Sequence, residues 1–210
     1  MKYFLIHGYG KALDLFESDI PSNGGFYIFD EEISREEAYI HHWAEQIERK
    51  RLTALNPLTQ LKLYYQERVK TESPAEIERL HDTLQEKKPI TIITHSSGAR
   101  LLMNYLKTYS LPESVQKIIL VQADVSQKEW ESCTLPAQVK WKNFWCWWDQ
   151  ALISSMILNR YIPLGPFTRD RTYSQFHSLR ILPNPHQDVW RDKKFKELLE
   201  KECKRVDNKK

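Results

Sequence analysis

The stretch "PITIITHSSGARLLMNYLK", residues 89–107, decides how the fold of this chain is interpreted. Residues 90–93 are all β-branched, which is typical of a buried strand. A helical pattern of apolar residues starts directly after Gly98. Ser96 and Ser97 therefore lie side by side where a strand gives way to a helix. A serine at such a junction either caps the helix or acts as a nucleophile, and the rest of the chain bears on that choice.

Short apolar runs alternate with helical patterns along the remaining chain. This alternation predicts an α/β fold with three α/β/α layers and a mainly parallel sheet of about six strands. A chain of 210 residues normally forms one domain, so a single domain over residues 1–210 is expected. Strands are expected at 2–6, 24–30, 90–93, 117–124, 139–149 and 178–182, and helices at 34–50, from 57, at 74–85, 99–109 and 193–206.

Composition excludes several classes of function. The net charge is only +3 and its lysines and arginines are spread along the chain, which argues against a nucleic-acid partner. No apolar run approaches the roughly 20 residues of a membrane-spanning helix, so no span is expected. Cys133, Cys146 and Cys203 are too widely separated for a disulfide framework or a metal site. The strand-like start lacks the features of a signal peptide, and a reduced, cytoplasmic protein is the expectation.

Residues able to carry acyl-transfer chemistry follow the expected strands. Ligands of parallel sheets bind beyond the carboxyl ends of the strands, so these positions should share one edge. The residues at this edge are His7-Gly8-Tyr9-Gly10, Ser96-Ser97, Asp124, Asp149 and His186. A serine, an aspartate and a histidine thus occur there in that chain order.

Four short motifs resemble those of the α/β-hydrolase family: "HGYG" (7–10), "THSSG" (94–98), "WDQAL" (148–152) and "NPHQD" (184–188). In this family the nucleophile stands in a tight strand–turn–helix with small residues two positions before and after it. Ser96 has Thr94 and Gly98 as these flanks, whereas Ser97 would have the bulky His95. The resemblance therefore makes Ser96 the nucleophile. Thr94 departs from the glycine usual at the first flank.

The resemblance also implies an acid and a base. Asp149 matches the family position after the penultimate strand, with Asp124 as an alternative one strand earlier. His186 lies between the last expected strand and the final helix, as the family requires of its base. His177 is the rival histidine, and Asp188 is interpreted as a surface charge or a cap for the last helix.

The same resemblance implies an oxyanion hole formed by the backbone N–H groups of Tyr9 and Ser97. The chain would begin at the third strand of the family fold and lack the first two. Residues 150–177 would form a small lid or a crossover segment. No cofactor and no metal are expected.

The expected activity is that of a serine hydrolase cleaving carboxylic esters or thioesters of a small-molecule substrate through an acyl-enzyme. Esterase, lipase, thioesterase and peptidase activities all remain open, as does the oligomeric state. The alternative is a catalytically silent α/β-hydrolase fold that serves as a binding module. A nucleotide-binding domain is disfavoured because neither G-x-G-x-x-G nor G-x-x-x-x-G-K-[ST] occurs in the sequence.

Overall fold

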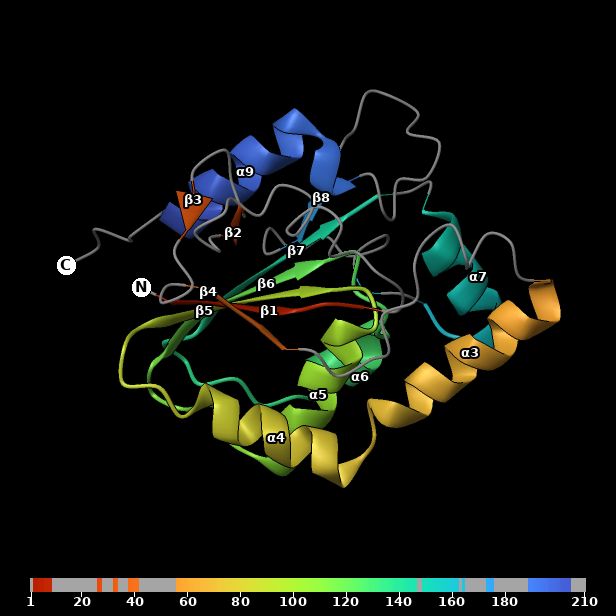
Figure 1. Cartoon of the computed structure of the whole chain (residues 1–210), viewed down its shortest axis with the longest axis horizontal. Helices are drawn as coiled ribbons and strands as arrows, with labels where there is room; N and C mark the ends of the chain where they lie inside the picture. The colour runs from red at the N-terminus through yellow and green to blue at the C-terminus, as the bar shows by residue number, and fades with distance from the viewer. Residues whose placement is uncertain are drawn as a thin grey trace.

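A parallel β-sheet flanked by helices on both faces forms the core of the computed structural model (Figure 1). The structure describes residues 2–8, 26–27, 32–33, 38–41, 56–146, 149–162, 164, 173–175 and 189–204. The predicted α/β class with a parallel sheet is confirmed. No helix among the described residues has the length and apolar character needed to cross a bilayer.

The sheet is parallel at every described strand pair. Its order is β4-β1-β5-β6-β7-β8, in which four longer strands form the centre and two shorter ones the edges. The central strands are β1 (Lys2–Ile6), β5 (Ile90–His95), β6 (Val115–Val121) and β7 (Lys140–Trp145), and the edge strands are β4 (Ala38–His41) and β8 (Tyr173–Gln175).

The strand order reverses direction between β1 and β5. From β1 the chain continues outward to β4, and it then crosses back to β5 and proceeds through β6, β7 and β8. The next strand of the sheet after β1 and the next one after β5 therefore lie on opposite sides of this strand pair. Parallel sheets bind their ligands in the crevice at such a reversal point. Residues 7–8 and 96–97 occupy this position.

Alternation of side chains along each strand builds two separate cores. Phe4, Ile92 and Leu120 point to the face that is covered by α4 (Pro74–Leu84), α5 (Gly98–Thr108) and α6 (Gln127–Glu131). Leu5, Ile93 and Val121 point to the opposite face. There they join a cluster with η1 (Val189–Arg191) and α9 (Lys193–Lys204), contributed by Trp190, Phe195, Leu199 and Cys203. The helices on the two sides make the three layers visible in Figure 1.

Helices α3 (Pro57–Lys70) and α7 (Gln150–Asn159) lie next to each other at the right-hand end of Figure 1. A hydrogen bond of 2.8 Å between Tyr64 Oη and Ser155 Oγ joins them. Each helix begins at a side-chain cap, since Asn56 accepts from the N–H of Thr59 and Asp149 from that of Leu152. These caps supply partners for N–H groups that the helix itself leaves without one.

The helix expected at 34–50 is contradicted at Ala38–His41, and the rest of that range lies outside the described residues. Ala38–His41 form β4 instead and pair in parallel with β1, with Tyr39 opposite Phe4. The pairing covers what would otherwise be an open edge of β1, and aromatic and β-branched residues such as Tyr39 and Ile40 suit a strand.

One other expected strand differs, and a further one is not tested. Phe26–Tyr27 (β2) pair with Glu32–Ile33 (β3) in a separate antiparallel ribbon and do not join the main sheet. The strand expected at 178–182 lies outside the described residues, and β8 is found earlier, at Tyr173–Gln175.

Gly98 brings the first turn of α5 against the end of β1. A Cβ atom at this position would lie 2.2 Å from the carbonyl oxygen of Ile6 and 2.7 Å from that of His7. Both atoms belong to the backbone, so neither can rotate out of the way. Only glycine permits this contact between strand and helix.

We expect Gly98→Ala to lower the free energy of unfolding by about 3 kcal/mol, because the added methyl group would overlap the backbone of β1. Alanine inside an ordinary helix stabilises it by about 1 kcal/mol relative to glycine. The sign of the change in unfolding free energy therefore distinguishes the close contact from an ordinary helix position. Urea unfolding followed by circular dichroism measures the effect, with Lys107→Ala on the exposed side of α5 as the control. A gain in stability for Gly98→Ala would contradict the contact.

Candidate active site

Ser96 occupies a strained turn between β5 and α5. Its φ is 52°, a left-handed value that costs a residue other than glycine about 1–3 kcal/mol. Backbone hydrogen bonds hold the turn in place. The N–H of Ser96 donates to Val121 (3.1 Å), and its carbonyl accepts from Ala99 (3.1 Å) and Asp124 (3.0 Å). Backbone strain that is held in place by several hydrogen bonds in this way occurs most often at functional positions.

The loop after β1 passes directly over this turn. A Cβ atom on Gly8 would lie 2.5 Å from Cβ and 3.1 Å from Oγ of Ser96. Gly98, two residues after Ser96, makes the backbone contact with Ile6 described above. Thr94, two residues before it, is fully buried in β5. The turn is therefore closed by small residues on both sides, with the threonine accommodated inside the strand.

Ser97 lies at the first position before α5, yet it does not act as an ordinary N-cap. Its backbone is helical (φ −64°, ψ −14°), and its side chain makes no capping hydrogen bond to the helix. A normal cap has extended dihedrals and a side-chain oxygen that accepts from the first turn. The simple capping interpretation of Ser97 thus lacks its characteristic contact. The backbone N–H of Ser97 stands at the N-terminus of α5, the end at which amide groups point outward.

Asp149 follows β7 and is completely buried. Its Oδ1 accepts a hydrogen bond of 3.0 Å from the N–H of Leu152, so the side chain also caps α7. This bond fixes the orientation of the carboxylate at the same edge of the sheet as Ser96.

Asp124 follows β6 and is also buried, but hydroxyl groups surround its carboxylate. Oδ1 accepts from Ser155 Oγ at 2.6 Å and from the hydroxyl of Tyr161, and Oδ2 accepts from Tyr64 Oη at 3.0 Å. Asn159 donates to both Tyr64 Oη and Ser155 Oγ. This cluster links the Ser96 turn to α3 and α7, since the backbone N–H of Asp124 bonds to Ser96.

The two tyrosine hydroxyl groups of this cluster, those of Tyr64 and Tyr161, have raised pKa values. Burial raises the pKa of Tyr161 well above the usual 10.0, and the negative charge of Asp124 raises it further. The pKa of Tyr64 is raised by the same two causes in the same order. Both tyrosines therefore remain neutral hydrogen-bond donors to Asp124 over the physiological range of pH.

His186, Tyr9, His177 and Asp188 lie outside the described residues. The described chain resumes at η1, where Val189 and Trp190 are buried. The indole ring of Trp190 stands edge-on to the imidazole of His95, with ring centroids 5.5 Å apart. The segment just after His186 is thus anchored beside the residue that precedes Ser96.

Sequence reasoning missed the hydroxyl cluster around Asp124 and the buried Arg100. The Arg100 guanidinium lies over the ring of Tyr161, 5.8 Å from its centroid, and 3.9 Å from the Glu129 carboxylate. The spacing of Ser155 and Asn159, four residues apart in an otherwise apolar helix, was the available signal. The described residues hold no group of three His, Cys, Asp or Glu side chains that could ligate a metal.

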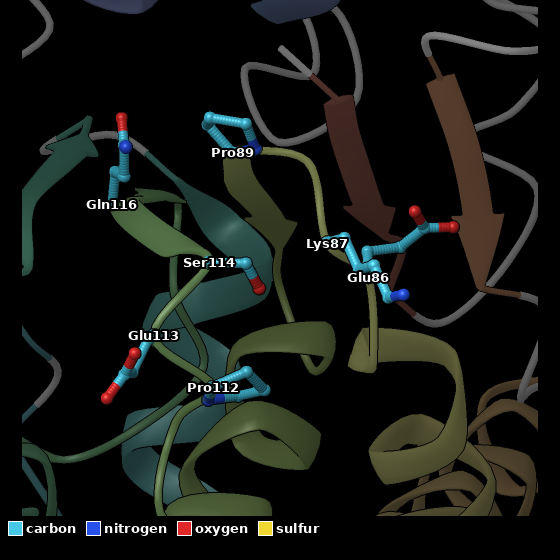
Figure 2. Close-up of a pocket in the computed structure, with 7 residues that line it drawn as sticks. All are labelled: Glu86, Lys87, Pro89, Pro112, Glu113, Ser114 and Gln116. Carbon is cyan, nitrogen blue, oxygen red and sulfur yellow. The ribbon is translucent and has the colours of Figure 1, made fainter.

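A pocket of about 470 Å³ lies at the opposite edge of the sheet (Figure 2). It is found at the N-terminal ends of β5 and β6, whereas Ser96 follows the C-terminal end of β5. Its lining residues are Glu86, Lys87, Pro89, Pro112, Glu113, Ser114 and Gln116. The length of β5, roughly 20 Å at about 3.3 Å per residue, separates this pocket from Ser96.

Comparison with known proteins adds little. No family model and no curated protein matches this chain. Among solved structures, the chain is similar to the lin2722 gene product of Listeria innocua, with 12% identity and a TM-score of 0.45 over 100% of this chain and 96% of that one. A likeness at this level carries no argument, so the proposals below depend on the geometry of the chain itself.

Tyr161→Phe removes one hydroxyl donor from the buried Asp124 carboxylate. We expect the free energy of unfolding at pH 8 to fall by about 1.5 kcal/mol, the usual value for a hydrogen bond to a charged group. Because the folded pKa of Tyr161 is raised, its contribution is complete below pH 10 and decreases as pH rises above 10. The difference between the two proteins should therefore narrow between pH 10 and 11.5 in urea titrations. A difference that stays constant or widens would contradict the assignment.

Proposed function

We propose that this protein is a serine hydrolase that cleaves carboxylic esters or thioesters. One observation carries the proposal: Ser96 stands in a strained left-handed turn between β5 and α5, at the point where the strand order reverses. This is the position and conformation that the nucleophile of an α/β-hydrolase requires, with its Oγ raised above the end of the sheet.

The arrangement of strands supports an α/β-hydrolase fold that lacks its first two strands. β1 is an interior strand with β4 on one side and β5 on the other, and the later strands continue outward in order. The strand before the Ser96 turn is paired with β1, so the loop that starts at His7 meets the turn directly. This loop leads to Tyr9, whose backbone N–H is proposed to form the oxyanion hole together with that of Ser97.

In the proposed reaction, Ser96 Oγ attacks the carbonyl carbon of the ester while His186 accepts the hydroxyl proton. The N–H groups of Tyr9 and Ser97 donate to the oxyanion that develops. Collapse of this intermediate breaks the bond to the alcohol or thiol, which takes the proton from His186, and leaves an acyl-enzyme. Water then gives a proton to His186 and attacks the acyl carbon. Collapse of this second intermediate breaks the bond to Ser96 Oγ, which takes the proton back from His186, and the acid is released.

Asp149 is the favoured acid of the triad. Both carboxylate oxygens of Asp124 accept hydrogen bonds from serine or tyrosine hydroxyls of α3, α7 and the segment after α7. Asp124 is therefore suited to a structural role. Asp149 is buried at the edge of the sheet that Ser96 occupies, and the N–H of Leu152 fixes its orientation through Oδ1.

The position of Trp190 supports His186 as the base. Four residues of extended chain span at most about 14 Å, and Trp190 packs on His95, the neighbour of Ser96. A histidine four residues before Trp190 is thus within chain reach of the Ser96 turn. We also propose a cytoplasmic location, because the three widely spaced cysteines do not form the disulfide framework typical of secreted proteins.

A fluorophosphonate probe tests the nucleophile. We expect wild-type protein to be labelled, Ser96→Ala to lose the label and Ser97→Ala to keep it, because Ser97 contributes only its backbone N–H. Intact-mass spectrometry measures the label. Labelling that survives Ser96→Ala would exclude Ser96 as the nucleophile, and a wild-type protein that is never labelled would favour the catalytically silent binding module.

Asparagine substitutions distinguish the two aspartates. Asp149→Asn keeps the oxygen that caps α7 but loses the charge that stabilises the imidazolium, so kcat for an activated ester such as p-nitrophenyl acetate should fall roughly 10³–10⁴-fold. Asp124→Asn should mainly lower stability, with less than a tenfold change in kcat. The reverse order of the two effects on kcat would assign the acid to Asp124.

A further inference from the structure

Helices α3 and α7 expose an unusual amount of apolar surface. Seven of the nine exposed large apolar side chains of the described residues come from these two helices and from the residue Ile162 just beyond α7. We call this set the α3–α7 surface: Leu58, Tyr65, Val69, Ile153, Ile157, Leu158 and Ile162. Apolar patches of this kind on a folded domain mark binding surfaces.

The exposed residues follow helical spacing. On α3, Leu58, Lys62, Tyr65 and Val69 are separated by four, three and four residues and so form one stripe along the helix. On α7, Ile153 and Ile157 are four residues apart and both exposed. Each of the two helices therefore carries its own row of exposed apolar residues, and the contact between Tyr64 and Ser155 holds the two helices next to each other.

The polarity of the two helices is inverted relative to an ordinary surface helix. Tyr64, Ser155 and Asn159 direct their polar groups inward to the Asp124 cluster. Their outward sides carry leucine, isoleucine and valine side chains together with the exposed polar residues Gln66 and Ser154. Helix α7 contains no charged residue at all between Gln150 and Asn159. The buried carboxylate of Asp124 accounts for the inward polar groups, whereas the outward apolar side chains are exposed.

The charges on the surface are of one sign. Lys62 and Arg160 are exposed, and the partly exposed Lys70 forms an ion pair of 3.3 Å with the buried Glu67. The only acidic residues within 57–70 and 149–162 are Glu67 and Asp149, and both are buried. Basic side chains thus lie among the apolar residues with no exposed carboxylate on the same two segments.

We propose that the α3–α7 surface docks on an anionic lipid bilayer. Exposed isoleucine and leucine side chains insert at the boundary of headgroups and acyl chains, while lysine and arginine contact acidic headgroups. A second copy of the chain fits less well, because a symmetric contact would place the basic side chains of Lys62 and Arg160 on one copy against a surface that carries the same basic side chains on the other. The docked side includes α7, whose N-cap is Asp149.

Sedimentation with sucrose-loaded vesicles tests the docking, and its outcome does not depend on whether Ser96 is a nucleophile. We expect the full chain to bind vesicles of 70% phosphatidylcholine and 30% phosphatidylglycerol at least tenfold more tightly than vesicles of phosphatidylcholine alone, since each basic residue near an anionic surface contributes about fivefold. Binding should weaken as NaCl is raised.

Matched variants locate the surface. Ile157→Asp removes an apolar side chain that is 67% exposed, and Leu58→Asp one that is 79% exposed; each should weaken vesicle binding about tenfold or more. Leu198→Asp is the control, because Leu198 is 45% exposed on α9, which covers the other face of the sheet. The pair Lys62→Glu and Lys201→Glu makes the same comparison for charge. Circular dichroism confirms that each variant is folded.

Three results would overturn the proposal. The first is no preference of the wild-type protein for the anionic vesicles. The second is an equal loss of binding in Leu198→Asp and in the two surface variants. The third is a dimer in gel filtration with light scattering that Ile157→Asp and Leu58→Asp dissociate, without vesicle binding, which would assign the surface to a second copy of the chain.

Discussion

The contact between the first turn of α5 and the end of β1 is the constraint on which the site depends. Gly98 lies so close to the carbonyl of Ile6 that no Cβ atom fits between them. This approach places the helix directly over the switch in strand order and forces the residues between β5 and α5 into a tight turn. Ser96 absorbs the geometry with a positive φ, and Gly8 leaves room for its side chain. The strain is local, and the backbone hydrogen bonds of the turn sustain it.

The Asp124 cluster explains a second part of the structure. A buried carboxylate is costly unless each oxygen accepts hydrogen bonds, and Tyr64, Ser155 and Tyr161 supply these. The donors come from α3, from α7 and from the segment after it, so both helices must turn polar residues inward. The Ser96 turn, which bonds to the N–H of Asp124, is thereby joined to the two helices that carry the exposed apolar surface.

Patterns among neighbouring residues in the sequence were sufficient to predict the central strands and helices of the fold. The β-branched run at 90–93, the stripe of Ile77, Leu80 and Leu84 and the strand-to-helix junction at Ser96 are each determined by neighbours in sequence, and the structure has them as expected. The position of Asp149 after a strand was also predictable. Its second role as the cap of α7 follows from the same residue, because aspartate is a favoured N-cap.

Features that depend on distant partners were not predictable. β4 exists because Ala38–His41 complete the edge of β1. In the sequence, Tyr39 and Ile40 also fit one face of a helix together with Trp43 and Ile47. The partners of Asp124 are 31 to 60 residues away, so no spacing rule connects them. The φ of Ser96 arises from packing between β1 and α5, which a single segment does not reveal.

The most direct test of the central claim is a crystal structure of the protein after reaction with a fluorophosphonate. The account predicts a covalent bond from phosphorus to Ser96 Oγ, a phosphoryl oxygen within hydrogen-bond distance of the N–H groups of Tyr9 and Ser97, and the His186 imidazole between Ser96 and Asp149. An adduct on any other residue, or a phosphoryl oxygen directed away from the N-terminus of α5, would contradict it.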